Sequence, residues 1–190
     1  MLPAMPLTQR LARLALRLMG WTVLDLPRRP HRAVVVGYPH TSNWDFLVGL
    51  LGMAALGLNA RWAGKDNLFR GPAGPLMRWL GGIPVNRRAH TGLVERLAAE
   101  MRRHDRFMLV IAPEGTRSLR PGWKSGFYRI ARAAEVPVLV GVVDYAHRRI
   151  GLLAGVTLSG DETVDMAAIA NCYHDCKGRR PQLASPIRLV

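Results

Sequence analysis

The chain has 190 residues, enough for one domain that buries most of its apolar surface without disulfides. Its 27 Lys and Arg against 13 Asp and Glu give a net charge of +14, which predicts a polyanionic partner such as nucleic acid or a phosphate-bearing membrane surface. The longest apolar run, Phe46 to Leu58, is shorter than the ~20 residues of a transmembrane helix, and arginines interrupt the only early apolar stretch. We therefore expect neither a membrane span nor a secretory signal, and a cytoplasmic location.

The first predicted element is a basic amphipathic helix over residues 7–19. At about 100° per residue its apolar side chains fall on one arc, beside a narrow stripe of arginines. The apolar arc consists of Leu7, Leu11, Leu14, Ala15 and Leu18, and the stripe of Arg10, Arg13 and Arg17. Such a helix can lie in a bilayer interface, or it can pack on the protein's own core with its arginines in solvent. Three more arginines at 28, 29 and 32 favour the membrane, so residues 1–30 are expected to form a membrane-surface helix and its lead-in.

Helical periodicity alternates with short apolar runs over the remaining residues, 31–190. Helices are expected at 44–58, 75–80, 93–103, 125–134 and 162–177, strands at 33–37, 61–63, 83–85, 107–112 and 137–143, and a hairpin through 149–156. This alternation predicts a single α/β domain with a mixed, largely parallel sheet flanked by helices. We also expect Trp62, Phe69 and Trp79 to pack in the core, and residues 178–190 to form a loosely held end.

Two cysteines, Cys172 and Cys176, lie one helical turn apart in the last predicted helix. That spacing could form a bridge or bind a metal, but the second pair that a zinc site needs is missing from the sequence. We expect reduced, structural thiols.

His40 and Asp45 follow the strand predicted at 33–37 and are separated by four residues. An imidazole titrates near pH ~6.5, so it can accept a proton from a hydroxyl at neutral pH, and a carboxylate beside it fixes its tautomer. The intervening Thr41, Ser42 and Asn43 are good helix caps, which would place His40 at the positive end of a helix dipole and disfavour imidazolium. The pair predicts a general base. Taken alone, the pattern also fits a structural histidine paired with a nearby acid.

Two further polar segments, 81–88 and 113–118, also follow predicted strands. In open α/β sheets ligands bind beyond the carboxyl ends of the strands, so both segments could meet His40 at one edge. Arg87 and Arg88 alternate sides of the chain, and at most one of them is expected to face the site.

The segment 113–118 is small and polar, in contrast to the buried strand predicted before it. Gly115 allows close approach of the backbone to a ligand, Thr116 offers a hydroxyl, and Arg117 can form paired hydrogen bonds with phosphate or carboxylate oxygens. The segment predicts an anion-binding loop. The alternative is an ordinary surface turn in which Glu114 and Arg117 pair with each other.

Together these segments resemble the motifs of the glycerolipid acyltransferases of the lysophosphatidic acid acyltransferase superfamily. The matching segments, in the order of that family, are His40 to Asp45, Gly82 to Arg87, Pro113 to Ser118, Trp123 to Gly126 and Val136 to Val138. The resemblance covers roughly residues 33 to 145, so residues 31–190 are expected to form an acyltransferase domain.

The resemblance implies an O-acyltransferase that moves a fatty acyl group from acyl-CoA or acyl carrier protein to a hydroxyl of a lysophospholipid or a glycerol phosphate. His40 would act as general base and Asp45 would orient it. The acceptor would be bound by Arg87, Glu114, Gly115, Thr116 and Arg117, with Lys124 assisting through its charge. No metal or other cofactor is expected, because the thioester is already activated. An anionic membrane would be the partner, with peripheral attachment to its inner face and no nucleic acid.

A basic, non-enzymatic protein that binds nucleic acid or an anionic membrane is the alternative, since the net charge of +14 suits it. A salt-dependent shift on random DNA without acyl transfer would favour this class. A serine hydrolase is disfavoured because the sequence has no G-x-S-x-G turn, and a dinucleotide-binding module because it has no G-x-G-x-x-G.

Overall fold

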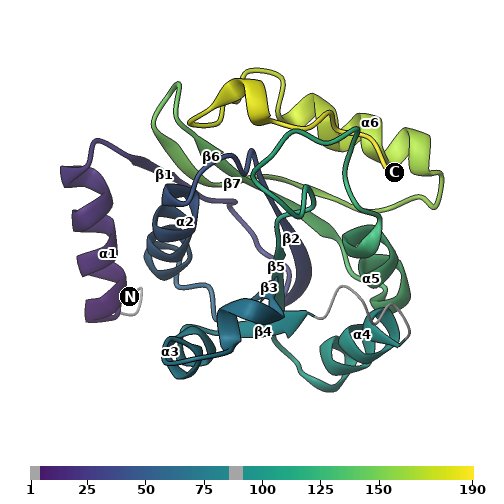
Figure 1. Ribbon diagram of the computed structural model, residues 1–190, viewed down its shortest axis with the longest axis horizontal. Coiled ribbons are helices and arrows are strands. Elements are labelled where there is room, and N and C mark those ends of the chain that lie inside the picture. The colour runs from purple at the N-terminus through teal and green to yellow at the C-terminus, as the bar shows by residue number, and fades with distance from the viewer. Residues whose placement is uncertain (1–4, 86–91) are drawn as a thin grey trace.

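The computed structural model describes residues 5–85 and 92–190, and in this part of the chain seven strands form one sheet (Figure 1). The strands are β1 (Thr22–Leu24), β2 (Arg32–Tyr38), β3 (Ala60–Lys65), β4 (Gly82–Val85), β5 (Phe107–Ile111), β6 (Val138–Asp144) and β7 (Arg149–Val156). Their spatial order is β1-β7-β6-β2-β5-β3-β4, and only the hairpin of β6 and β7 pairs antiparallel among these strands. The predicted mixed, largely parallel sheet is confirmed.

Six α-helices and two short 3-10 helices accompany the described strands. They are α1 (Leu7–Leu18), α2 (Trp44–Ala55), η1 (Asp66–Phe69), α3 (Gly74–Trp79), α4 (Leu93–Arg103), α5 (Gly126–Ala134), α6 (Glu162–Cys172) and η2 (Pro181–Leu183). The helix α6 ends earlier than predicted, so Cys176 lies beyond it, and both cysteines are free thiols. None of the described helices is long and apolar enough to cross a bilayer.

Strand β2 lies in the middle of the sheet and is buried on both faces. Val34 and Val36 pack with the side chains of α4, α5 and α6, while Ala33 and Val35 contribute to a second cluster on the opposite face. Figure 1 shows the corresponding layers, with α1 and α2 on one side of the sheet and α4, α5 and α6 on the other. Burial on both faces explains the uninterrupted apolar run that predicted this strand.

The prediction that Trp79 packs in the core is wrong. Trp62 and Phe69 are buried and stack at 5.6 Å between ring centroids, as expected, but Trp79 is 80% exposed. Trp79 is the last residue of the short helix α3, which lies beside the edge strand β4, and its side chain is in solvent.

Helix α1 packs on α2 through a face other than the predicted apolar arc. Ala12 and Leu16 are buried against α2 and the end of the sheet. Gln9 and Arg13 donate hydrogen bonds to the carbonyl oxygen of Ala55 at 3.0 and 2.9 Å, which satisfies an unpaired carbonyl at the end of α2. The predicted apolar arc is thus left on the outer side of α1, with exposed side chains at Leu7, Leu11, Leu14 and Leu18.

Candidate active site

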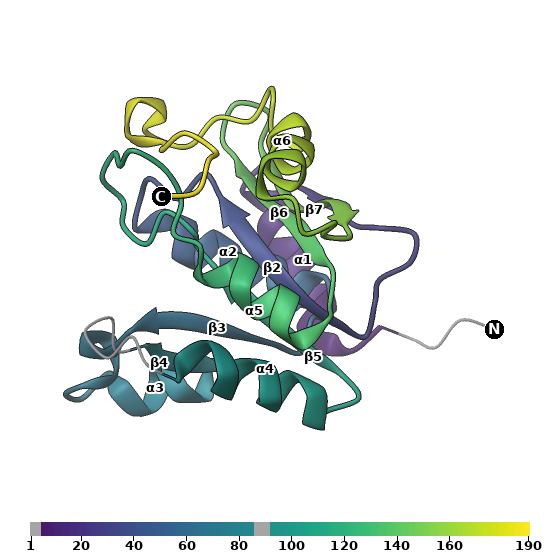
Figure 2. The same ribbon diagram turned by 90° about the vertical axis from the view of Figure 1, so that its right-hand side faces the viewer.

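The carboxyl ends of the central strands bring distant segments together. Figure 2 shows the arrowheads of β2 and β3 on one side of the molecule, together with the loop after β5 and the yellow C-terminal segment. Strands β2 and β5 pair in parallel with Val36 opposite Ile111, so the chain leaves both strands at the same level. The backbone N–H of His40 donates to Oε2 of Glu114 at 2.6 Å. The first and third polar segments therefore meet at one edge, as the sequence predicted.

His40 and Asp45 form a pair at the start of α2. The imidazole Nδ1 lies 3.5 Å from Oδ2 of Asp45, and the same oxygen accepts the backbone N–H groups of Thr41 and Ser42, each at 2.7 Å. Asp45 is buried, whereas 22% of the His40 side chain is exposed. The start of the helix thus holds one oxygen of the carboxylate, and the imidazole is accessible to a ligand.

The pKa of His40 is lowered from its ordinary value of 6.5 to about 4, chiefly because burial disfavours the charged imidazolium. The carboxylate of Asp45 acts in the opposite direction, and the positive charge of Arg117 lowers the pKa further. His40 is therefore neutral at pH 7. A neutral base was predicted from the helix dipole, but burial is the largest cause.

Glu114 is 1% exposed and binds backbone at both carboxylate oxygens. Oε2 accepts the N–H of His40, and Oε1 accepts the N–H of Ser185 at 2.8 Å. Burial raises the pKa of this carboxyl, and the two backbone hydrogen bonds oppose that rise. Glu114 thus holds the backbone of His40 in place, and its predicted contact with substrate stays a prediction.

Arg117 lies beside the His40 segment. Its Nε donates to the carbonyl oxygen of Ser42 at 3.2 Å, and the residue as a whole is exposed. The alternative pairing of Arg117 with Glu114 is not seen: Arg117 bonds to Ser42, and the Glu114 oxygens accept the backbone N–H groups of His40 and Ser185. Thr116, one residue earlier, is half-buried. This geometry places a guanidinium next to the base.

Gly115 and Lys124 line an apolar cavity of about 460 Å³ next to this edge of the sheet. Gly115 has φ of +68°, a left-handed conformation that favours glycine. The apolar lining comes from α4, α5 and the end of β5, and includes Leu93, Val94, Leu97, Ile111, Phe127 and Ile130. The remaining predicted contact, Arg87, lies outside the described residues.

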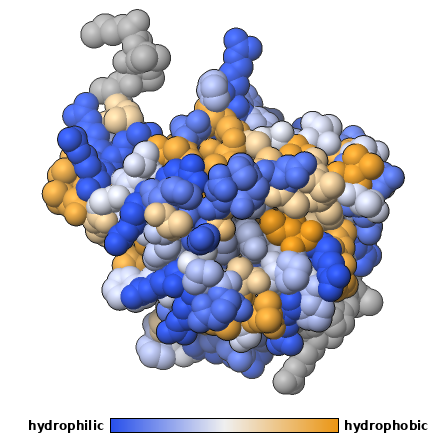
Figure 3. Space-filling view, turned by 90° about the horizontal axis from the view of Figure 1, so that it is seen from above, coloured by the Kyte–Doolittle hydropathy of each residue, from blue (hydrophilic) through white to orange (hydrophobic). Residues whose placement is uncertain are grey.

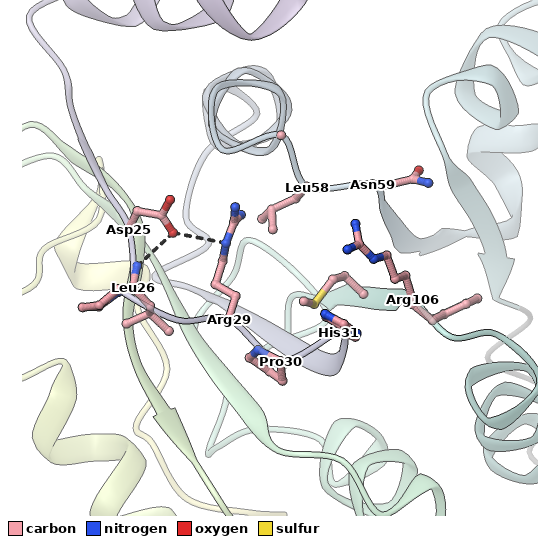
Figure 4. A pocket seen from close by; sticks show the side chains of 12 residues that line it. Asp25, Leu26, Arg29, Pro30, His31, Leu58, Asn59 and Arg106 are labelled. Carbon is pink, nitrogen blue, oxygen red and sulfur yellow. Dashed lines mark hydrogen bonds and ion pairs between the residues drawn. The ribbon is translucent and has the colours of Figure 1, made fainter. Parts of the chain in front are cut away.

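A second cavity, of about 450 Å³, lies at the opposite, amino ends of β2 and β5 (Figure 4). His31 and Arg106 line it, and the carboxylate of Asp25 pairs with Arg29 at 3.5 Å. No histidine with a carboxylate partner lines this cavity in the described residues. The pair of His40 and Asp45 therefore marks the better candidate for an active site.

Sequence reasoning missed two contributors to the site. The hydroxyl of Tyr145 donates to Oδ1 of Asp45 at 2.9 Å, and the backbone N–H of Arg180 donates to Oγ1 of Thr41 at 3.1 Å. Tyr145 directly follows β6, which pairs with β2, so its place after a buried strand was a usable signal. The contact of Arg180 is made by backbone and has no signature in the sequence.

A family model described as Acyltransferase matches residues 17–143, more than half of the chain. The chain belongs to the acyltransferase family. The fold of this acyltransferase is similar to that of the 1-acyl-sn-glycerophosphate (LPA) acyltransferase PlsC from Thermotoga maritima, with a TM-score of 0.54 and 17% sequence identity over 90% of this chain and 80% of that one. Membership of the acyltransferase family and the fold expected from the resemblance are thereby confirmed, whereas a glycerolipid acceptor stays a prediction. A search of curated proteins finds no match to this acyltransferase.

Proposed function

We propose that the protein transfers a fatty acyl group from an acyl thioester to a hydroxyl of a lysophospholipid or a glycerol phosphate. The observation that carries this proposal is the neutral His40, paired with buried Asp45 and adjacent to Arg117, in a member of the acyltransferase family. A base beside a cationic side chain suits an acceptor that carries both a hydroxyl and a phosphate.

In the proposed reaction His40 removes the proton from the acceptor hydroxyl as its oxygen attacks the thioester carbonyl. The tetrahedral intermediate then expels the thiolate, which receives the proton from His40, so the base is regenerated. Asp45 stabilises the imidazolium that exists between these steps. General base action of this kind contributes ~10²–10⁴-fold, and the positioning of both substrates supplies much of the remaining acceleration.

Arg117 is proposed to bind the acceptor phosphate, because it is exposed and fixed beside the base by its bond to Ser42. Lys124 would add positive charge, as would Arg87, whose role is implied by the family resemblance. The apolar cavity next to Gly115 is proposed to hold the acyl chain, since its lining is largely aliphatic and aromatic. The thioester carbonyl would then lie between this cavity and His40.

The protein is proposed to associate peripherally with an anionic membrane through α1. The exposed leucines of α1 lie among basic side chains, which is the pattern of a helix in a bilayer interface. Figure 3 shows apolar side chains beside hydrophilic ones at the left edge of the molecule, where α1 lies. Acceptor and product are both amphiphiles, so this attachment would hold the active site near its substrates.

The test is a screen of lysophospholipid and glycerol phosphate acceptors with purified protein and one labelled acyl thioester, read by mass spectrometry. Acyl-CoA and acyl carrier protein are compared as donors. We expect one acceptor class to be acylated by wild-type protein, and His40→Ala to lose this activity while retaining its circular dichroism spectrum. Transfer by His40→Ala at the wild-type rate would reject the mechanism. A salt-dependent shift on random DNA with no transfer would favour the non-enzymatic alternative.

A further inference from the structure

We propose that Tyr145 is a positioning residue for the catalytic pair, a role that rests on the proposed function. Its hydroxyl donates to Oδ1 of Asp45 at 2.9 Å. The other oxygen, Oδ2, lies 3.5 Å from Nδ1 of His40 and accepts two backbone N–H groups at the start of α2. Tyr145 and His40 therefore contact opposite oxygens of one carboxylate.

This division of contacts fixes the orientation of the carboxylate. A carboxylate held only at Oδ2 could rotate about its Cβ–Cγ bond, and rotation would change the distance between Oδ2 and the imidazole. The phenol removes that freedom because it binds the second oxygen from the turn between β6 and β7, an element other than α2. Second contacts of this kind position a catalytic group more accurately than a single pair.

Tyr145 is itself held in place by two neighbours. Its backbone N–H donates to the carbonyl oxygen of Lys177 at 2.8 Å. Its ring meets that of Trp21 edge-on, with the centroids 5.0 Å apart. The hydroxyl of Tyr145 is therefore directed at Asp45 by the C-terminal segment on one side and by Trp21, just before β1, on the other.

The phenol stays a donor over the working pH range. Burial raises the pKa of Tyr145, and the negative charge of Asp45 raises it further, whereas the positive charges of Arg179 and Arg148 act in the opposite direction. A neutral phenol withdraws negative charge from Asp45 and so weakens its attraction for an imidazolium. Loss of the phenol would leave more negative charge facing His40 and raise the pKa of His40.

Among the described residues, the charged groups that face His40 lie on α2 and on the loop after β5. Asp45 lies on α2, and Arg117 and Glu114 lie on the loop after β5. Because substitution of Tyr145 leaves these three groups unchanged, a displaced titration of His40 can be assigned to the missing hydrogen bond.

The experiment compares Tyr145→Phe with a matched control, Tyr128→Phe. The hydroxyl of Tyr128 also donates to a buried carboxylate, Oδ2 of Asp165 at 2.7 Å, but this pair lies between α5 and α6, away from His40. Both variants lose one hydrogen bond from tyrosine to aspartate, so each is expected to lower the free energy of unfolding. Only Tyr145→Phe is expected to change the catalytic pair.

For Tyr145→Phe we expect kcat to fall about 10-fold with KM for both substrates unchanged, and the acidic limb of the rate profile to move to higher pH. Tyr128→Phe should keep the wild-type kcat and profile. A Tyr145→Phe protein that matches wild type, or that differs only as Tyr128→Phe does, would overturn the proposal.

A second measurement does not depend on acyl transfer by the protein. The pKa of the His40 imidazole is followed by NMR titration in wild type and both variants, and in a protein that carries 2,3-difluorotyrosine at position 145. The expected pKa is higher than wild type in Tyr145→Phe and lower with the more acidic fluorinated phenol, and identical titrations would overturn the proposal. If wild type transfers no acyl group, the proposed function fails, whereas this titration still decides whether Tyr145 acts on the pair.

Discussion

Ser185 and His40 donate their backbone N–H groups to opposite oxygens of the same buried carboxylate, that of Glu114, at 2.8 and 2.6 Å. The segment expected to be a loosely held end is therefore linked through Glu114 to the loop that carries His40. Arg180 adds a second bond by donating its N–H to Oγ1 of Thr41. The C-terminal segment thus belongs to the scaffold of the candidate active site.

The pH dependence of transfer should reflect the lowered pKa of His40. A base with a pKa of about 4 is neutral throughout the physiological range, so kcat/KM should stay level down to acidic pH and decline only near pH 4. The same lowered pKa makes the stability of the folded protein depend on pH. The unfolded histidine titrates near ~6.5 and binds its proton first, so this group lowers the free energy of unfolding as pH falls from ~6.5 toward 4. Rate profiles in buffers of constant ionic strength check this, and an acidic limb at pH 6.5 would contradict the assignment.

Arg117→Ala should weaken acceptor binding. Loss of a hydrogen bond between charged groups costs ~1.5–3 kcal/mol, so KM for the acceptor should rise about 10- to 100-fold. Because Arg117 also lowers the pKa of His40, its removal should move the acidic limb to higher pH. Steady-state kinetics at varied acceptor concentration measure both effects. The control for the lost charge is Arg96→Ala, which removes an exposed arginine from α4. An equal rise in the KM of this variant for the acceptor would argue for nonspecific attraction instead.

The outer face of α1 should govern binding to vesicles. Leu11→Ser with Leu14→Ser removes apolar surface from exposed positions, so flotation with anionic vesicles should decrease while the unfolding midpoint stays within a few degrees of wild type. Val164→Ser on α6 is the matched control, because Val164 is as exposed as these leucines. Unchanged flotation of the double variant would show that the membrane contact lies elsewhere.

Gly178→Ala should disturb the base through the C-terminal segment. A Cβ at this buried position would come within 2.6 Å of Oγ1 of Thr41 and 2.9 Å of its Cγ2, so the loop beside His40 must move. We expect kcat to fall at least severalfold, since small displacements of catalytic groups are costly. Gly49→Ala is the control: its Cβ would meet nothing within 4 Å, and alanine favours the helix α2. If both variants keep full activity, Gly178 does not control the geometry of the site.

The sequence was sufficient to predict which segments meet where chemistry-bearing residues follow clearly marked strands. His40 and Asp45 follow a strand buried on both faces, and the parallel register of β2 and β5 brings Glu114 and Arg117 to the same edge. Apolar runs of this kind mark central strands clearly, so the α/β class and the meeting of the two segments could be inferred before the structure.

The parts that could not be predicted depend on tertiary contacts without a sequence pattern. Strand β1 has only three residues, none of them buried, and pairs at the edge of the sheet with β7. Ser185 acts through its backbone N–H, which every residue except proline possesses. On α1, the inward face proved to be that of Ala12 and Leu16, because periodicity defines an apolar arc without saying what covers it.

The central position of β2 in the sheet protects it from local unfolding. With neighbours on both sides, β2 can exchange its amide hydrogens only when the whole domain comes apart, whereas β4 at the margin can open locally. We therefore expect His40 to be attached to the slowest-exchanging part of the described chain. Motion during the proposed turnover would then be confined to the periphery, while the histidine keeps its place from one cycle to the next.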